Sequence, residues 1–223
     1  MDNGSVMAVE SSIDSQNVSI LYIVFKRVFD ILCGIIGFII LIPLTVIVKI
    51  AYICSGDFYS IFYTQDRVGK NGKIFHMYKY RTMCPNADKK LKELLKQKKY
   101  KEEWDKYQKL EDDPRITKFG KILRKCSIDE MPQFINILKG DISLIGPRPL
   151  VPGEIEKHHG DKKLYESVKP GITGWWAVNG RSAKNYEERL ELEYYYAKNR
   201  SVKLDTKIFF KTFKVIKTHE GAK

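Results

Sequence analysis

The sequence predicts an α-rich α/β domain that is attached to a membrane by a helix near its N-terminus. An uncharged apolar run of 18 residues extends from Ile31 to Val48, which is the lower limit for a helix that spans a bilayer. Residues 57–83 are enriched in β-branched and aromatic residues around a glycine-containing turn, as in a β-hairpin. Apolar residues recur at helical spacing among charged ones in 86–110 and again after residue 185, as in amphipathic helices.

The composition is strongly basic. The 223 residues include 39 Lys and Arg against 27 Asp and Glu, which gives a net charge of +12. This excess predicts an anionic partner, such as a phospholipid surface or a phosphorylated substrate. We expect no nucleic-acid partner, because the sequence contains no helix-turn-helix, zinc-finger or RNA-recognition motif. The length suits one ordinary domain with a sizeable core.

The cysteines are scattered along the chain and form no CxxC pair. Together with the histidines they give no spacing that is typical of a zinc site. They predict reduced, unpaired thiols in a cytosolic compartment. The four are Cys33, Cys54, Cys84 and Cys126.

Residues 1–21 are predicted to be a disordered tail, because the stretch before Leu21 contains no Lys or Arg and is rich in Ser, Asn and Asp. Residues 22–55 are predicted to be the membrane segment. A buried core helix of a soluble protein is the alternative. It is disfavoured because soluble helices usually keep a polar face.

The flanks of the apolar run predict how it meets the membrane. Basic residues precede it at Lys26 and Arg27 and follow it at Arg67 and Lys70. Because Lys and Arg accumulate on the cytoplasmic side of a membrane, both ends are expected on that side. Pro43 inside the run removes a backbone hydrogen bond and bends a helix. We therefore expect a re-entrant helix that enters and leaves the membrane by the same face.

Two further regions predict helices that lie at a membrane surface. Residues 86–110 combine apolar residues at rough helical spacing with many lysines, which predicts one or two amphipathic helices able to touch anionic head groups. Residues 185–219 predict two helices, of which the second is basic and amphipathic. Trp175 and Trp176 precede them and suit the core and the membrane interface equally.

Two adjacent carboxylates, Asp129 and Glu130, form the centre of the sequence. Ser127 and Glu130 match a capping box, which by itself marks a helix start. Pro132 conflicts with so early a start, so the regular helix is also consistent with a start nearer Pro132, and Gly140 is a natural end. Either start puts Asp129 near a helix N-terminus. That position favours negative charge and keeps the carboxylate ionised, as a nucleophile must be.

The residues around this pair favour chemistry on a diphosphate. A carboxylate that attacks a diphosphate meets like-charge repulsion, so the reaction needs positioned cations and usually a divalent metal. Arg124 precedes the pair, Arg148 follows it between two prolines, and Glu130 is able to bind Mg²⁺. A glycosidase is an alternative use of two carboxylates. Adjacent residues are poorly placed for it, since such enzymes need them about 5 Å or more apart across a sugar ring.

Several motifs together resemble the bacterial monotopic phosphoglycosyl transferases, from about residue 22 to the C-terminus. The resemblance implies that a sugar 1-phosphate passes from a UDP-sugar to undecaprenyl phosphate. Asp129 would attack the sugar-linked phosphate and expel UMP, and the polyprenol phosphate would then attack the phosphosugar-enzyme intermediate. The motifs are KRVFD, KYRTM, DDPRITKFGKILRKCSIDEMPQFINILKGDISLIGPRP and KPGITGWWAVNGR.

The resemblance also assigns roles to residues. Glu130 would be the partner of Asp129 beside Mg²⁺, with both as metal ligands, and whether Glu130 is a metal ligand or a base stays open. Arg124 would support the pair, and Arg148 in the Pro-Arg-Pro turn would grip the nucleotide phosphate. The chain has Ile42-Pro43 where the family often has Ser-Pro, and it lacks the glutamine of the family's GWAQVNGR. The remaining candidates for substrate binding are Pro147, Lys79, Arg81, Arg115, Asn179 and Arg181.

The predicted whole is a catalytic domain, residues 56–223, on the cytoplasmic face of a bacterial inner membrane. It would carry out the first membrane step in building a polysaccharide. The charged stretch 86–110 and the C-terminal tail favour galactose or glucose as the sugar. The expected partners are a UDP-sugar, undecaprenyl phosphate, membrane phospholipid and a second copy in a homodimer. We expect the chain to lack the multi-pass N-terminal region of larger members. A non-catalytic scaffold that binds polyprenol phosphate is the alternative.

Overall fold

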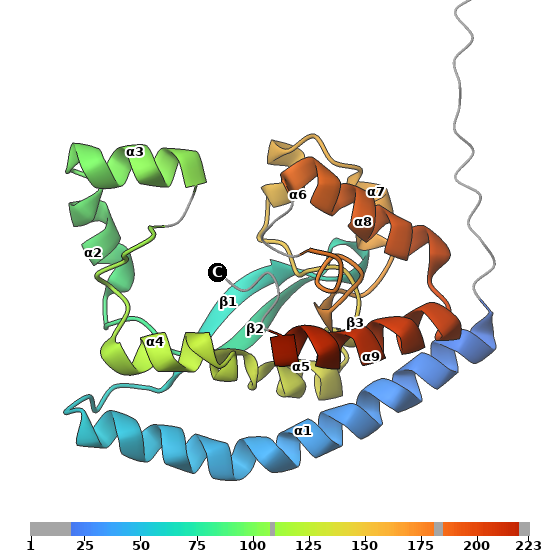
Figure 1. The fold of residues 1–223 in the computed structure, drawn as a ribbon, viewed down its shortest axis with the longest axis horizontal. Helices are drawn as coiled ribbons and strands as arrows, with labels where there is room; N and C mark the ends of the chain where they lie inside the picture. The colour runs from blue at the N-terminus through green and yellow to red at the C-terminus, as the bar shows by residue number, and fades with distance from the viewer. Residues whose placement is uncertain (1–18, 108–109, 181–184, 219–223) are drawn as a thin grey trace, which may run out of the picture.

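A computed structural model of the chain describes residues 19–107, 110–180 and 185–218 (Figure 1). One long helix, α1 (Ile20–Cys54), runs beneath a domain of shorter helices and two small sheets. Most of the predicted tail, residues 1–18, lies outside the described residues. Helix α1 begins two residues before the predicted membrane segment and ends one residue before its predicted end.

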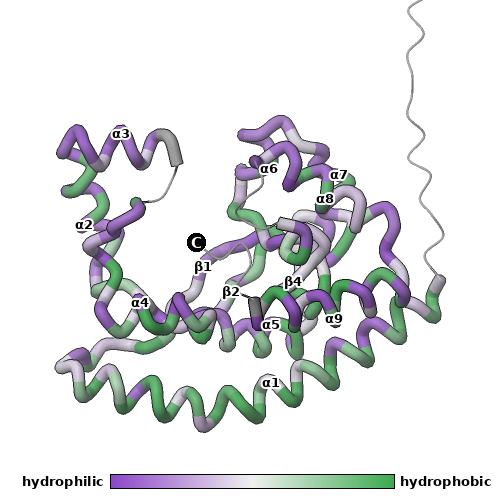
Figure 2. Tube along the Cα trace, viewed as in Figure 1, coloured by the Kyte–Doolittle hydropathy of each residue, from purple (hydrophilic) through white to green (hydrophobic). Residues whose placement is uncertain are grey.

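Helix α1 presents one narrow stripe to the domain and leaves the rest of its surface open. Its buried residues are three, four, seven or eight positions apart, which are the spacings of one face of a helix. The large apolar residues between them are exposed, for example Ile39 at 61% and Ile47 at 62%. Figure 2 shows that hydrophobic residues occur along most of the helix. The domain therefore does not enclose α1, which contradicts a buried core helix. The buried residues are Tyr22, Asp30, Gly34, Gly37, Leu41, Val48 and Tyr52.

Within the described residues, α1 is the one helix long and apolar enough to cross a membrane. Pro43 lies inside it and the helix continues through this residue. The helix bows along its length rather than breaking into two (Figure 1). The curve is gradual over the whole helix, as in long helices that wrap around a domain, and differs from the local bend expected at Pro43.

Helix α5 (Gln133–Lys139) packs against α1 at two glycines. A Cβ added at Gly34 would lie 2.7 Å from Leu138, and one at Gly37 would lie 2.3 Å from the ring of Phe134. Arg27 of α1 donates to the carbonyl oxygens of Ile137 and Leu138 at 2.7 and 2.9 Å. It thereby provides hydrogen bonds to carbonyls at the C-terminal end of α5, where Ile137 O also accepts from Gly140 N at 3.0 Å.

The predicted hairpin is confirmed. Strands β1 (Phe62–Val68) and β2 (Ile74–Tyr80) pair antiparallel, with Phe62 opposite Tyr80 and Val68 opposite Ile74. The turn between them includes the 3₁₀ segment η1 (Lys70–Gly72). The outer edge of β2 is covered by α5, because the side-chain amide of Asn136 donates to His76 O at 2.8 Å and accepts from Tyr78 N at 3.0 Å. This amide takes the place of a neighbouring strand.

A second sheet pairs β3 (Ser143–Ile145) and β4 (Gly171–Thr173) in parallel. Two short helices lie between them in the chain, α6 (Glu154–Lys157) and α7 (Lys162–Glu166). Asp30 of α1 is buried at this sheet and accepts from Leu144 N at 2.9 Å. The small sheet is therefore fixed directly to the long helix.

Residues 86–110 form two helices, α2 (Ala87–Leu94) and α3 (Lys98–Tyr107), which stand apart from α6–α8 in Figure 1. Helix α4 (Lys118–Lys125) follows them. The C-terminal region forms the two predicted helices, α8 (Tyr186–Asn199) and α9 (Val202–Thr218).

Helix α9 buries Ile208 in the domain and exposes Phe210 and Phe213. Trp175 is half-buried, stacks on Tyr195 and lies 5.2 Å beneath Lys207 and Lys211. The four cysteines lie in the described part of the chain and are free thiols, as predicted.

Candidate active site

The carboxylate pair lies on a short connection between α4 and α5. Ser127 adopts the left-handed conformation at φ 55°, and residues 128–130 form the 3₁₀ turn η2 (Ile128–Glu130). The side chain of Ser127 makes no capping hydrogen bond with the described residues, so the capping box is wrong. Helix α5 instead begins after Pro132 and ends at Gly140, as the second interpretation predicted. A proline suits this place because its φ is already helical.

Two elements place cations around the pair. Lys79 comes from β2 and its Nζ lies 3.1 Å from Glu130 Oε1. Arg124 comes from the last turn of α4, where its Nε donates to Thr82 Oγ1 at 2.9 Å. Asp129 itself makes no ion pair with the described residues. The structure therefore brings together four of the predicted site residues: Asp129, Glu130, Arg124 and Lys79.

Burial raises the pKa of Asp129, and the neighbouring charge of Glu130 raises it further. Lys79 and Arg124 act in the opposite direction. The sequence predicted that a helix N-terminus would keep Asp129 ionised, but the pair lies on a 3₁₀ turn of three residues before α5 begins. Lys79 and Arg124 thus favour the ionised form of Asp129 from this turn.

Helix α4 is held against the end of the hairpin by unusually close packing. Thr117 caps α4 by accepting from Gly120 N at 2.9 Å, and its own amide donates to Thr82 O at 3.0 Å. A Cβ at Gly120 would lie 2.0 Å from Thr82 O. No residue other than glycine fits there without displacing the helix. This contact sets the position of Arg124 relative to Asp129.

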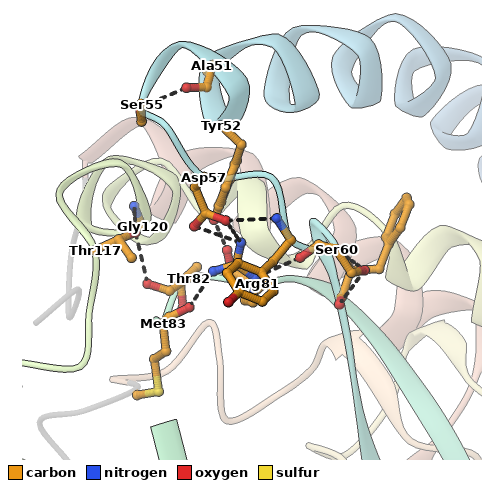
Figure 3. A network of polar contacts seen from close by, with 12 residues as sticks. Ala51, Tyr52, Ser55, Asp57, Ser60, Arg81, Thr82, Met83, Thr117 and Gly120 are labelled. Atoms are coloured by element: carbon orange, nitrogen blue, oxygen red, sulfur yellow. Dashed lines mark hydrogen bonds and ion pairs between the residues drawn. The ribbon is translucent and has the colours of Figure 1, made fainter. Parts of the chain in front are cut away.

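Arg81 belongs to the KYRTM motif that also contains Lys79. Its guanidinium, however, is bound to groups other than the carboxylate pair (Figure 3). Its guanidinium forms two bonds to Asp57, at 2.8 and 2.9 Å. It also donates to Ser60 O at 2.7 Å and to Met83 O at 2.8 Å. Its own carbonyl accepts from Tyr52 OH of α1. Arg81 therefore joins the end of α1 to the hairpin.

Arg115 is likewise buried and forms a bidentate pair with Asp113, the shortest contact being 2.6 Å. The side-chain amide of Asn179 donates to Trp175 O at 2.6 Å and accepts from Lys211 Nζ at 3.2 Å. The structure does not bring Arg81, Arg115 or Asn179 to the carboxylates as free groups. Arg181 lies outside the described residues.

The Pro147-Arg148-Pro149 turn holds its backbone rigidly. Pro147 O accepts from Gly171 N at 2.7 Å and Arg148 N donates to Glu193 Oε1 at 3.0 Å. Arg148 O accepts from Tyr165 OH at 2.8 Å. These partners come from β4, α8 and α7, so three elements fix two consecutive residues.

The other side of the turn is fixed by strand β1. Arg67 donates to Pro149 O at 3.1 Å, and Val68 N donates to Leu150 O at 2.9 Å. The guanidinium of Arg148 is exposed and makes no hydrogen bond or ion pair with the described residues. A rigid backbone and a free, charged side chain are what a site for an anion requires.

Arg67 is a candidate site residue that sequence reasoning did not select. It is buried, its Nε has no hydrogen-bond partner within the described residues, and burial together with the nearby charge of Arg148 lowers its pKa to about 10. Glu130 acts in the opposite direction. Arg67 thus joins strand β1 to the turn that carries Arg148. No sequence signal marked it, because an arginine in a strand is usually on a solvated face.

Asp129 and Glu130 are the residues that would hold a metal ion. The described residues contain no group of three or more His, Cys, Asp or Glu that could do so. Two carboxylates nonetheless fit Mg²⁺, which usually keeps several waters and takes oxygens from substrate phosphates. The like-charge repulsion that raises the pKa of Asp129 is also what a bound cation relieves.

Comparisons with known proteins show which family the chain is similar to. The family model described as bacterial sugar transferase matches residues 21–219. The chain is 44% identical over 198 residues to the undecaprenyl-phosphate galactose phosphotransferase of Salmonella typhimurium, which covers 88% of the chain and 41% of that protein. It is 40% identical to the exopolysaccharide production protein ExoY of Sinorhizobium fredii, over 88% of the chain and 87% of that protein.

A third relative is the galactosyl transferase CpsE of Streptococcus agalactiae, at 42% identity over 91% of the chain and 44% of that protein. The chain thus spans about two fifths of the length of the Salmonella and Streptococcus relatives. It spans most of the length of ExoY.

Proposed function

We propose that this chain, which belongs to the bacterial sugar transferase family, transfers a sugar 1-phosphate from a UDP-sugar to undecaprenyl phosphate. The observation that carries the proposal is the environment of Asp129. This carboxylate is half-buried, unpaired within the described residues, and flanked by Lys79 and Arg124 from two other elements. Such a group is suited to attack an anionic centre once the repulsion has been offset.

In the first step an oxygen of Asp129 forms a bond to the sugar-linked phosphorus. The bond from that phosphorus to the bridging oxygen breaks, and UMP leaves with the electron pair. Arg124 and Lys79 offset the charge that gathers at the phosphorus. Arg148 binds the nucleotide phosphate, because its guanidinium is exposed and free of partners in the described residues.

In the second step a phosphate oxygen of the acceptor attacks the same phosphorus, and Asp129 leaves as a carboxylate. The product is an undecaprenyl diphosphate sugar. Asp129 and Glu130 would hold Mg²⁺, which supplies Lewis-acid polarisation of the phosphoryl oxygens when it is bound. Glu130 is already fixed by Lys79 at 3.1 Å, so its orientation does not depend on the substrate.

We further propose that α1 lies within one leaflet of the cytoplasmic membrane. Near its start Lys26 pairs with Asp205 at 2.8 Å, and near its end Tyr52 bonds to Arg81 O. A helix of 35 residues is about 52 Å long, against about 30 Å for the hydrocarbon core. Because polar groups at both ends bond to the same domain, both ends are expected on the same side, the cytoplasmic one. This supports the re-entrant placement.

A groove beside α1 offers a place for the acceptor's isoprenoid chain. It lies between the second half of α1 and the start of β1, has a volume of about 500 Å³, and is lined by residues that include Thr45, Lys49 and Phe62. Phe62 stacks on Tyr80, and Ile128 and Met131, on either side of the carboxylate pair, pack against the apolar cluster that contains Tyr80. An apolar chain would lie in the groove and its phosphate would reach Asp129.

The sugar we propose is a hexose, with galactose first. The names of three relatives specify galactose, namely the Salmonella and Streptococcus proteins and the UDP-galactose-lipid carrier transferase of Erwinia amylovora. Contact with phospholipid through α9 and assembly as a homodimer stay predictions.

The experiment that tests the function measures UMP release. Detergent-purified chain is mixed with Mg²⁺, undecaprenyl phosphate and one UDP-sugar at a time. We expect release with one hexose donor, and loss of at least a thousandfold for Asp129→Asn. Asp88→Asn in the exposed start of α2 is the matched control and should behave as the native chain. No release with any donor would favour the scaffold.

A further inference from the structure

Glu193 of α8 is one of the most deeply buried charged residues in the described chain, with 1% of its surface exposed. Its Oε1 accepts from Arg148 N at 3.0 Å. Its Oε2 is buried and has no hydrogen-bond partner among the described residues. A half-satisfied buried carboxylate is costly, so its retention calls for a reason beyond packing.

The neighbouring arginine does not explain Glu193 by pairing with it. Arg189, one turn earlier on α8, is directed to Glu154 of α6 at 3.5 Å and lies over the ring of Trp176 at 5.0 Å. Its Nε has no hydrogen-bond partner in the described residues. The contact that Glu193 does make is therefore the one to Arg148.

Glu193 and Tyr165 form hydrogen bonds with the two backbone polar groups of Arg148. Glu193 accepts from the amide, and Tyr165 OH donates to the carbonyl at 2.8 Å. Both are buried, whereas the guanidinium of Arg148 is exposed. The prolines on either side of Arg148 restrict the backbone further. The buried side chains thus fix the main chain of Arg148, from which the exposed guanidinium extends.

We propose that Glu193 is a positioning residue, which fixes the backbone of Arg148 so that its guanidinium is held ready for the donor's phosphate. This rests on the proposed function for the identity of the ligand. A carboxylate is a better acceptor for this amide than a neutral group, because hydrogen bonds to charged acceptors are roughly twice as strong. Preorganisation of a cation lowers the cost of binding an anion.

The protonation of Glu193 makes the hydrogen bond to the Arg148 amide depend on pH. Burial raises its pKa to about 7, while the Arg148 amide, Arg189 and the Arg148 guanidinium act in the opposite direction. The other titratable group that faces it is Tyr165 of α7. Below about pH 7 the carboxyl becomes neutral and the hydrogen bond to the Arg148 amide weakens. Donor binding should weaken with it.

The test measures binding of UDP, which lacks the sugar and does not react, to the full chain in detergent with Mg²⁺. Glu193→Leu should weaken UDP binding about tenfold. Glu193→Gln keeps an acceptor oxygen and should stay within about threefold at pH 8, but it should lose the part of the pH dependence between 6 and 8 that the native chain shows. Tyr165→Phe is a second variant that leaves Glu193 in place and should weaken binding in the same direction.

A double-mutant cycle separates positioning from general stability. Arg148→Ala should weaken UDP binding, and adding Glu193→Leu or Tyr165→Phe to it should change the affinity less than twofold. Equal effects with and without Arg148 would overturn the proposal, as would native affinity in both single variants. UDP binding without UMP release from any UDP-sugar would contradict the transferase while leaving the positioning role intact. Absence of UDP binding by the native chain would contradict both.

Discussion

Lys79 Nζ and Glu130 Oε1 lie 3.1 Å apart and join the second strand of the hairpin to the carboxylate pair. This contact gives two residues that are adjacent in sequence different environments. Glu130 is held by a cation, while Asp129 is half-buried without an ion pair in the described chain. The first carboxylate is therefore free to react, and the second is fixed beside it.

Removing Lys79 should shift the pH dependence of the reaction. Lys79 lowers the pKa of Asp129, against the larger effect of burial. Lys79→Met should therefore raise that pKa and move the acidic limb of the rate profile to higher pH. We expect a loss of about tenfold at pH 6 and a smaller loss at pH 8. Rates of UMP release across pH 5.5–8.5 measure this, with the exposed Lys73→Met as the control. An unshifted limb would contradict this role of Lys79.

Gly120→Ala should disturb the site by moving α4. The added Cβ would meet Thr82 O at 2.0 Å, and backbone cannot give way cheaply. We expect a loss of about 1–3 kcal/mol in stability, together with lower activity because Arg124 moves with the helix. Thermal unfolding and UMP release measure both. Lys121→Ala, on the exposed side of the same helix, should change neither. Native behaviour of Gly120→Ala would show that the close approach is not essential.

Asp57→Asn tests whether Arg81 contacts substrate or holds the fold. Asp57 forms the bidentate pair with Arg81, whose side chain is 11% exposed. We expect a loss of about 2–4 kcal/mol, because the arginine is left without its partner. The KM for the UDP-sugar should stay within about twofold. Asp66→Asn breaks the exposed contact to His76 and serves as the control. A large rise in donor KM with unchanged stability would restore the substrate role.

Filling the groove beside α1 should impair only the second half of the reaction. Val46 lines the groove, and Val46→Trp would occupy space proposed for the isoprenoid chain. We expect the KM for undecaprenyl phosphate to rise about tenfold, while the burst of UMP formed without acceptor is unchanged. Ile39→Trp, on the open face of α1 outside the groove, is the control. A lower burst for Val46→Trp would place the groove in donor chemistry instead.

Glu193→Gln should raise stability at neutral pH. The folded-state pKa of Glu193 is about 7, above its ordinary value of 4.5. The native chain therefore loses stability as pH rises from 4.5 to 7, and the full cost, about 3 kcal/mol, is present above pH 7. Glu193→Gln avoids this cost and should unfold at a higher temperature than the native chain at pH 8, with the difference vanishing near pH 4.5. Glu191→Gln, an exposed neighbour, should follow the native chain.

The parts of the fold set by local pattern were predictable from the sequence. The hairpin around Gly72, the two charged helices, and the start of α5 after Pro132 follow from turn chemistry, helical period and proline geometry. Asp129, Glu130 and Arg124 lie close together in the chain. Lys79 of the KYRTM motif, which was among the predicted site residues, lies beside Glu130 in the structure.

The rest depends on contacts between distant segments. Arg81 and Arg115 look like free cations in the sequence, but Asp57 and Asp113 occupy them. Glu193 lies 45 residues from Arg148, and nothing in a helix rich in Glu distinguishes it from its exposed neighbours. Asn136 replaces a missing strand with a side-chain amide. Burial and partner choice are tertiary properties, so the sequence pattern alone does not contain them.

The central claim is that Asp129 carries the sugar phosphate between donor and acceptor. The most direct measurement is mass spectrometry of the native chain after reaction with its UDP-sugar in the absence of undecaprenyl phosphate, followed by peptide mapping. We predict one phosphosugar adduct, located on Asp129, formed together with an equal amount of UMP and discharged when the acceptor is added. Steady turnover with no adduct, or an adduct on another residue, would contradict the account.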